Sequence, residues 1–87
     1  MRAVVEVSMY PLTDDYIPPI DVFLEKIRTY PEVKVSTNPS STRIIGEYDD
    51  VMRCVNESMK NSYESGVKAT FVMKVLNNPA DKTKWDD

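Results

Sequence analysis

The sequence contains no histidine and only one cysteine, Cys54, among its 87 residues. A disulfide framework, a Cys/His zinc cluster, a Ser-His-Asp triad and a Cys-His pair are excluded, because each needs residues that are missing. Carboxylate chemistry stays open, with Glu6 and Glu47 as the candidate acid–base pair, although no sequence signal fixes their separation. We therefore expect a binding protein that is not an enzyme, with no metal and no cofactor other than a bound ligand.

Long apolar runs and clustered basic residues are also missing. No stretch approaches the roughly 18 to 20 apolar residues of a membrane span, and the segment from Met1 to Val7 carries charges and lacks the cleavage site of a signal peptide. The net charge is −3 and lysines and arginines are scattered, so the phosphate neutralisation that drives nucleic-acid binding is weak. The prediction is a cytoplasmic protein with no nucleic-acid partner and no membrane insertion.

What is present is the composition of a single globular domain. Hydrophobic residues make up 41% of the chain and charged residues 29%, which is an ordinary balance for a folded protein. A chain of this length builds one modest core. We expect residues 1–78 to form a ligand-binding domain and residues 79–87 to form a polar C-terminal tail.

Four segments show the alternation of apolar and polar residues that is typical of strands, namely 3–10, 33–37, 42–48 and 67–76. Pro11 ends the first, because proline cannot donate to a β-ladder. Only a short polar turn separates the second from the third, which predicts an antiparallel hairpin. On the last strand, the side expected to face the core carries Val67, Ala69, Phe71, Met73 and Val75.

A first helix is predicted by an apolar stripe with helical spacing. The stripe consists of Ile20, Phe23, Leu24 and Ile27. We expect Thr13 or Asp15 to cap the start of this helix and Pro18–Pro19 to occupy its first turn, where N–H groups have no helical partner anyway. Pro31 is expected to stop the helix near Tyr30.

A second stripe predicts another helix after the third strand. It consists of Met52, Val55, Met59 and Tyr63. Asp49 or Asp50 is expected to cap its start, and Gly66 is placed where a left-handed C-terminal cap is needed. Cys54 is interpreted as a small buried filler, since no histidine can activate it, and Met52, Met59 and Met73 as core.

The order strand, helix, strand, strand, helix, strand predicts an α+β, ferredoxin-like βαββαβ sandwich. In this fold an antiparallel four-stranded sheet carries both helices on one face. The uncovered face is expected to present Glu6, Ser8, Tyr10, Arg43, Ile45, Glu47, Thr70, Val72 and Leu76. This mixture is too apolar for simple solvation, so we expect a partner sheet, a ligand or both, and hence a homodimer or homotetramer.

Three polar clusters are candidate sites. They are the strand end 8–16, the turn 37–42 and the acidic junction 46–50. Each also fits an ordinary local role, because such residues favour turns and helix starts. The residues alone therefore predict a small binding module without naming its ligand.

A resemblance to a known family goes further. The stretch from Ser8 to Ile17 (SMYPLTDDYI), the stretch 41–46 (STRIIG) and the stretch 49–52 (DDVM) resemble the YkoF-type family, which binds thiamine and its hydroxymethylpyrimidine moiety. The resemblance covers residues 5–77 and is most specific in the S-x-Y-P element near the N-terminus. It implies a ferredoxin-like fold and non-enzymatic binding of thiamine or hydroxymethylpyrimidine, in salvage or transport of the vitamin precursor.

The resemblance also implies which residues contact the ligand. In this sequence they are Ser8, Tyr10, Ser41 and Thr42. We add Asn38 and Tyr48 from chemistry, because an aminopyrimidine needs oriented hydrogen-bonding groups and an aromatic or apolar surface. The family can carry two repeats in tandem where this chain has one, which again favours self-association. Sequence leaves open whether the pocket lies between sheet and helices or at an oligomer interface.

A second hypothesis is a small-molecule-sensing interaction subunit that regulates a partner protein. It rests on Trp85, a large aromatic residue in an otherwise polar tail, because such residues often anchor interfaces. The alternative for Trp85 is that it folds back onto its own domain.

Overall fold

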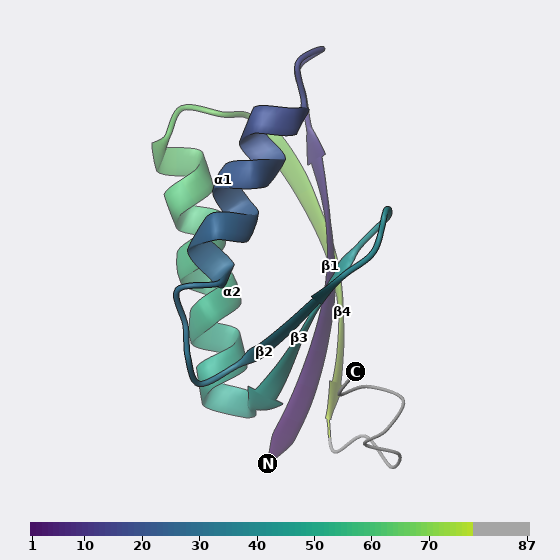
Figure 1. Ribbon diagram of the computed structural model, residues 1–87, viewed down its shortest axis with the longest axis vertical. Coiled ribbons are helices and arrows are strands. Elements are labelled where there is room, and N and C mark those ends of the chain that lie inside the picture. Colours follow the sequence, from purple (N-terminus) through teal and green to yellow (C-terminus); the bar gives the residue numbers. More distant parts are fainter. Residues whose placement is uncertain (78–87) are drawn as a thin grey trace.

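The computed structural model describes residues 1–77, in which two helices pack on a four-stranded sheet (Figure 1). In chain order the elements are β1 (Arg2–Pro11), α1 (Ile17–Ile27), β2 (Lys34–Thr37), β3 (Thr42–Glu47), α2 (Tyr48–Glu64) and β4 (Ala69–Asn77). This order confirms the predicted ferredoxin-like α+β fold. The predicted tail 79–87, with Trp85, lies outside the described residues.

The sheet has the strand order β2-β3-β1-β4, and every neighbouring pair is antiparallel. Both helices lie on the same face of this sheet, as Figure 1 shows. β1 is therefore central and is covered from one side, while β2 and β4 form the two edges. No helix in the part of the chain that the structure describes is long and apolar enough to cross a membrane.

Side chains of β1 alternate between the two faces of the sheet, as the period of a strand requires. Val5 and Val7 point toward the helices, and Ile44 of β3 lies beside them because it pairs with Val5. Around these residues the core contains Phe23, Ile27, Tyr30, Val51, Cys54 and Val55. The core thus sits between the sheet and both helices.

The opposite, open face carries the residues that the alternation predicted, because Glu6 pairs with Arg43 and Lys74. Its centre is nevertheless buried, since Val4 and Ile45 are almost fully inaccessible. Exposed apolar side chains on this face are Tyr10, Val72 and Leu76. They gather along β4 and at the end of β1.

α1 begins and ends at residues other than those predicted. Tyr16 is the N-cap and neither Thr13 nor Asp15 caps the helix, because the first helical bond runs from the Ile20 N–H to the Tyr16 carbonyl. The prolines do occupy the first turn. The helix ends at Ile27, four residues before Pro31: the Thr29 N–H and hydroxyl both donate to the Lys26 carbonyl and tighten the chain into a turn.

α2 begins at Tyr48, which was predicted to end the preceding strand. The Tyr48 N–H donates to the Met1 carbonyl at 2.8 Å, so this group has a partner without a capping side chain. Glu47 is the N-cap, whereas Asp49 and Asp50 lie in the first turn and do not cap it. Their negative charges there still complement the helix dipole.

The buried side of α2 is shifted from the predicted stripe. The buried residues are Val51, Cys54, Val55, Ser58 and Ser62. The small side chains among them let α1 approach closely, and the Cys54 thiol lies 3.7 Å from the Ile27 carbonyl oxygen. Cys54 is thus the predicted filler, whereas Tyr63 is exposed and Met52 and Met59 are half-buried toward β4.

β4 begins at Ala69, two residues later than predicted. Gly66 precedes it with a φ of 96°, which confirms the expected left-handed cap after α2. On the helix-facing side, Phe71 packs against Phe23 with a ring-centre distance of 4.9 Å. The prediction that Met73 belongs to the core was wrong, because β4 is an edge strand and Met73 is 39% exposed.

Candidate functional site

A cavity of about 100 Å³ lies where the β2–β3 loop meets α1 and β1. One wall is apolar and consists of Val7, Met9, Ile20, Phe23 and Leu24. The other wall is the loop itself, from Thr37 to Thr42. This combination of an apolar surface with a few placed polar groups is typical of small-molecule sites.

The apolar wall follows from the periods of its two elements. Val7 and Met9 reach the cavity from β1 because odd-numbered residues of this strand face the helices. Ile20 and Leu24 lie one helical turn apart on α1 and remain half-buried. They border the cavity at the edge of the packed core.

The polar wall is organised by Asn38. Its Oδ1 accepts hydrogen bonds from the N–H groups of Ser40 and Ser41, both at 2.9 Å, and from their hydroxyls at 3.2 and 3.3 Å. The Asn38 N–H in turn donates to the Ser41 carbonyl at 2.9 Å. The Ser41 hydroxyl donates its hydrogen to Asn38 Oδ1. Its oxygen keeps lone pairs that can accept a hydrogen bond from a ligand.

Thr42 is the buried polar residue of this wall. It is 7% exposed and pairs with Val7, which places it on the helix-facing side of the sheet beside the cavity. A threonine hydroxyl in a cavity wall can donate one hydrogen bond and accept others, so Thr42 is a candidate ligand contact.

Ser8 lies on the open face and does not line the cavity. Its hydroxyl donates to the Ser40 carbonyl at 3.0 Å and so ties the β2–β3 loop to β1. The structure therefore brings Asn38, Ser41 and Thr42 together in the cavity wall and places Ser8 behind the loop.

The two predicted tyrosines lie away from the cavity. Tyr10 is exposed on the open face, opposite Thr70. Tyr48 sits at the other end of β1, where it bonds to Met1. The structure does not bring either ring to the loop.

On the apolar wall, Ile20, Phe23 and Leu24 were predicted only as the apolar stripe of a helix, with no cavity beside them. Apolar residues that border a cavity repeat with the same helical period as residues that pack a core. The spacing of Ile20 and Leu24 therefore could not indicate a cavity. Met9 did have such a signal, because it is the second residue of the S-x-Y-P element that resembles the family. That Met9 faces the helices and Ser8 the open face follows only from the alternation of side chains along a strand.

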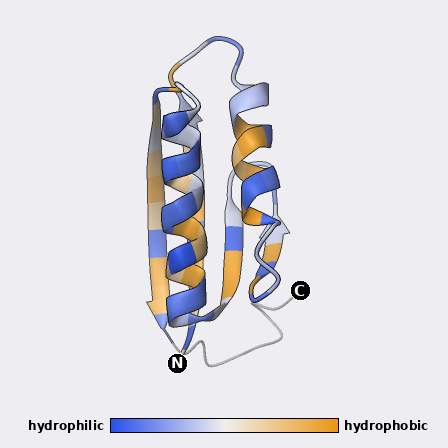
Figure 2. Cartoon of the chain, turned by 90° about the vertical axis from the view of Figure 1, so that its left-hand side faces the viewer, coloured by the Kyte–Doolittle hydropathy of each residue, from blue (hydrophilic) through white to orange (hydrophobic). Residues whose placement is uncertain are grey.

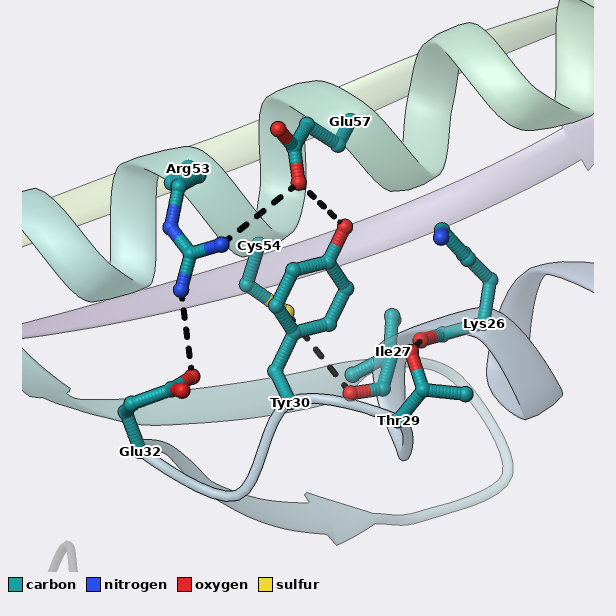
Figure 3. A network of polar contacts seen from close by, with 8 residues as sticks. All are labelled: Lys26, Ile27, Thr29, Tyr30, Glu32, Arg53, Cys54 and Glu57. Atoms are coloured by element: carbon teal, nitrogen blue, oxygen red, sulfur yellow. Dashed lines mark hydrogen bonds and ion pairs between the residues drawn. The ribbon is translucent and has the colours of Figure 1, made fainter.

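A network of ionisable groups lies elsewhere and joins the end of α1 to α2 (Figure 3). The Tyr30 hydroxyl donates to Glu57 Oε1 at 2.6 Å, and Arg53 pairs with Glu32 at 3.2 Å. Burial, with the hydrogen bond and the charge of Glu57 as further causes, raises the pKa of Tyr30 to about 12. None of its members lines the cavity beside the β2–β3 loop, whereas Arg53 and Glu57 line a second cavity between α2 and β4.

Cys54 is buried beside this network. Burial raises the pKa of its thiol to about 11, so the sulfur is protonated at neutral pH and is a poor nucleophile. The Glu6 and Glu47 carboxylates do not form a pair either, because Glu47 pairs with Arg2, four residues from Glu6 along β1. Glu6 lies 4.0 Å from Lys74, and Glu47 lies 3.6 Å from the N-terminal amine.

The arrangement supports binding by neutral contacts. None of the residues around the cavity is charged, and residues 1–77 contain no group of three His, Cys, Asp or Glu that could hold a metal ion. The cavity can hold one small, uncharged ring by apolar contact and hydrogen bonds to hydroxyls.

Comparison with known proteins relates this site to a family. The sequence profile of a family described as thiamine-binding protein matches residues 5–87. The chain belongs to this family. Membership confirms the resemblance to thiamine-binding proteins drawn from the sequence, and the family's description is one of binding. No curated protein matches the chain significantly.

Solved structures agree with the thiamine-binding family in fold. A Thermotoga maritima protein provisionally assigned to thiamine biosynthesis or salvage has a TM-score of 0.81 and 21% identity, over 97% of this chain and 95% of that one. A hypothetical protein from Methanocaldococcus jannascii has a TM-score of 0.78 and 21% identity, over 92% and 84% of the two chains. A Streptococcus pneumoniae protein has a TM-score of 0.76 and 23% identity, over 97% and 96%.

Proposed function

We propose that this protein binds the aminopyrimidine ring of thiamine, or free hydroxymethylpyrimidine, in the cavity between the β2–β3 loop and α1. It does so without catalysis, in salvage or transport of the vitamin precursor. The observation that carries the proposal is a cavity that brings the hydroxyls of Ser41 and Thr42 opposite an apolar wall, in a member of the thiamine-binding family.

The chemistry of the ring suits the two walls. An aminopyrimidine is flat, with an amino donor beside ring-nitrogen acceptors, so it needs one acceptor, one donor and apolar surface. The Ser41 oxygen provides the acceptor, the Thr42 hydroxyl provides the donor, and Phe23 with Leu24 provides the surface. About 100 Å³ is well below the volume of a drug-sized pocket, which favours a single ring and leaves the thiazolium of thiamine outside.

Charge favours ligands without phosphate. The cavity wall has no lysine or arginine, and the chain carries a net charge of −3. A phosphate group would find no partner there and would meet a weakly repulsive field. We therefore expect hydroxymethylpyrimidine and thiamine to bind more tightly than thiamine diphosphate.

Calorimetric titration with hydroxymethylpyrimidine, thiamine and thiamine diphosphate tests the proposal. Thr42→Val keeps the shape of the side chain but removes its hydroxyl, so we expect the dissociation constant of hydroxymethylpyrimidine to rise roughly 3- to 10-fold. Thr42→Ser keeps the hydroxyl and is the matched control, with an affinity close to that of the natural protein.

Two outcomes would count against the proposal. Absence of heat and of any thermal shift with all three compounds would reject thiamine-related binding. Equal affinities of the Thr42→Val and Thr42→Ser variants would remove Thr42 from the site.

A further inference from the structure

A small pocket lies on the open face of the sheet, at the end where β4 finishes. It has a volume of about 240 Å³ and is lined by Val4, Glu6, Lys74, Val75 and Leu76. Figure 2 shows β4 beside α2 as mainly hydrophobic along its length. The pocket therefore combines three aliphatic side chains with one carboxylate and one ammonium group.

One residue that lines this pocket, Val4, is buried although neither helix covers it. Val4 is 2% exposed, and Ile45, which pairs with it across the sheet, is 1% exposed. Both helices lie on the opposite face of the sheet (Figure 1). Such burial on a face without a helix favours a cover that comes from outside the six elements.

The chain that follows β4 starts beside this pocket. β4 ends at Asn77, one residue after Leu76. The next two residues are Asn78–Pro79, a dipeptide that favours turns and so lets the chain reverse its direction. Trp85 is eight residues beyond Asn77, so its Cα can lie up to roughly 26 Å from that of Asn77. The pocket is well within this reach.

Reach and charge argue against two other cavities as places for Trp85. One of them includes Lys68, which precedes Asn77 by nine residues, or roughly 30 Å of strand. The other lies between α2 and β4 and is within reach, but Arg53, the cation among its described lining residues, already pairs with Glu32 and Glu57. Acidic residues next to Trp85 would therefore find only an engaged cation there.

The chemistry of the open-face pocket matches a tryptophan that is followed by acidic residues. An indole offers a large apolar surface and a single N–H donor. The aliphatic side chains of the pocket provide apolar contact, and the Glu6 carboxylate can accept a hydrogen bond from the N–H. The Lys74 side chain is 85% exposed, so its ammonium group is accessible to a carboxylate of Asp86–Asp87.

We propose that residues 79–87 fold back over this end of the open face and that the Trp85 indole occupies the pocket. Its N–H donates to Glu6, and a carboxylate of Asp86–Asp87 pairs with Lys74. The occupant is the tail of the same molecule, because a tether as short as residues 78–84 gives the indole a high effective concentration at the pocket. Docked in this way, Trp85 covers apolar residues of its own sheet and is not free to anchor a partner protein.

Fluorescence tests the docking directly, because Trp85 is the only tryptophan in the sequence. In the folded protein we expect emission at a shorter wavelength, and weaker quenching by acrylamide, than in the protein unfolded by urea. Both quantities should be independent of protein concentration. A folded protein whose Trp85 is quenched as readily as in the unfolded chain would overturn the proposal. Emission that moves to the unfolded wavelength on dilution would also overturn it, because a second copy would then fill the pocket.

Leu76→Glu places a carboxylate in the pocket beside Glu6 and should shift the emission of Trp85 to the wavelength of the unfolded chain. Val72→Glu is the matched control, because it places the same charge on the same face of β4 but outside the pocket. Any effect on contacts between copies through this face is common to both variants, and the emission of Val72→Glu should stay that of the natural protein. Circular dichroism checks that both variants fold. Equal emission of the two folded variants would overturn the proposal.

A charge exchange provides a second test that leaves the apolar wall intact. Lys74→Glu changes an exposed side chain and should increase the quenching of Trp85, because it repels Asp86–Asp87. Adding Asp86→Lys and Asp87→Lys to Lys74→Glu should restore the weak quenching, because the attraction forms again with opposite signs. Quenching that is unchanged in Lys74→Glu, or that stays high in the triple variant, would overturn the proposal.

Discussion

Neighbouring residues of β1 serve opposite faces of the sheet. Met9 lines the cavity, whereas Ser8 points to the open face and holds the Ser40 carbonyl at 3.0 Å. The loop that carries Ser41 and Thr42 is therefore fixed from behind by a residue outside the cavity. We assign Ser8 a positioning role for the proposed ligand.

Ser8→Ala should weaken the binding of hydroxymethylpyrimidine roughly 2- to 5-fold, because one hydrogen bond that orders the loop is lost. The amides of Ser40 and Ser41 should exchange faster in this variant. Ser36→Ala, at another serine of the open face, is the control and should change neither quantity. Lost affinity with unchanged loop exchange would indicate direct contact and contradict a positioning role.

Part of the candidate site could be predicted from sequence. Asn38, Ser41 and Thr42 form a polar turn between two strands, so their closeness follows from the chain itself. Ser8 was predicted to contact the ligand, but it lies behind this turn and outside the cavity wall, because strand parity turns it to the open face. Tyr48 was added for its ring alone, and its place at the far end of β1 follows from the pairing of β1 with β3.

Among the elements, the sequence predicts their order better than their ends. Apolar period and turn residues identify two helices and four strands, because these signals are local. The ends depend on distant partners: α2 starts at Tyr48 because the Met1 carbonyl lies there. The buried side of α2 depends on α1, since the small residues Ser58 and Ser62 are buried where the larger Met59 and Tyr63 were expected.

The contact between the end of α1 and α2 depends on Tyr30. Its hydroxyl bonds to Glu57, and its ring lies 5.4 Å from the Lys26 ammonium and 5.3 Å from the Arg53 guanidinium. Cations over a tyrosine ring add attraction to the hydrogen bond. The network thus fastens the chain just after the helix has ended.

Tyr30→Phe should lower the free energy of unfolding by about 1.5 kcal/mol at pH 8, because a hydrogen bond to a charged acceptor is lost. The pKa of Tyr30 is about 12 in the folded state against 10.0 ordinarily. A raised pKa means that this stability is complete below pH 10 and is lost as the pH rises toward 12. The difference between the two proteins should therefore shrink between pH 8 and pH 11 in urea denaturation.

Tyr63→Phe removes a hydroxyl from an exposed tyrosine of α2 and is the control for hydroxyl loss at pH 8. A Tyr30→Phe difference of the same size at pH 8 and pH 11 would contradict the assigned role of the neutral hydroxyl.

At the scale of the whole molecule, the open face of the sheet exposes apolar side chains, among them Val72, which is 53% exposed. We expect the open face to pack on a second sheet, as proposed from the resemblance to a family that can carry tandem repeats.

Val72→Glu should disrupt the open-face contact, because the new carboxylate would be buried against the second sheet, and light scattering should then give a smaller mass. Val22→Glu, at an exposed apolar residue of α1, is the matched control and should leave the mass unchanged. An unchanged mass in Val72→Glu would place the contact between copies elsewhere.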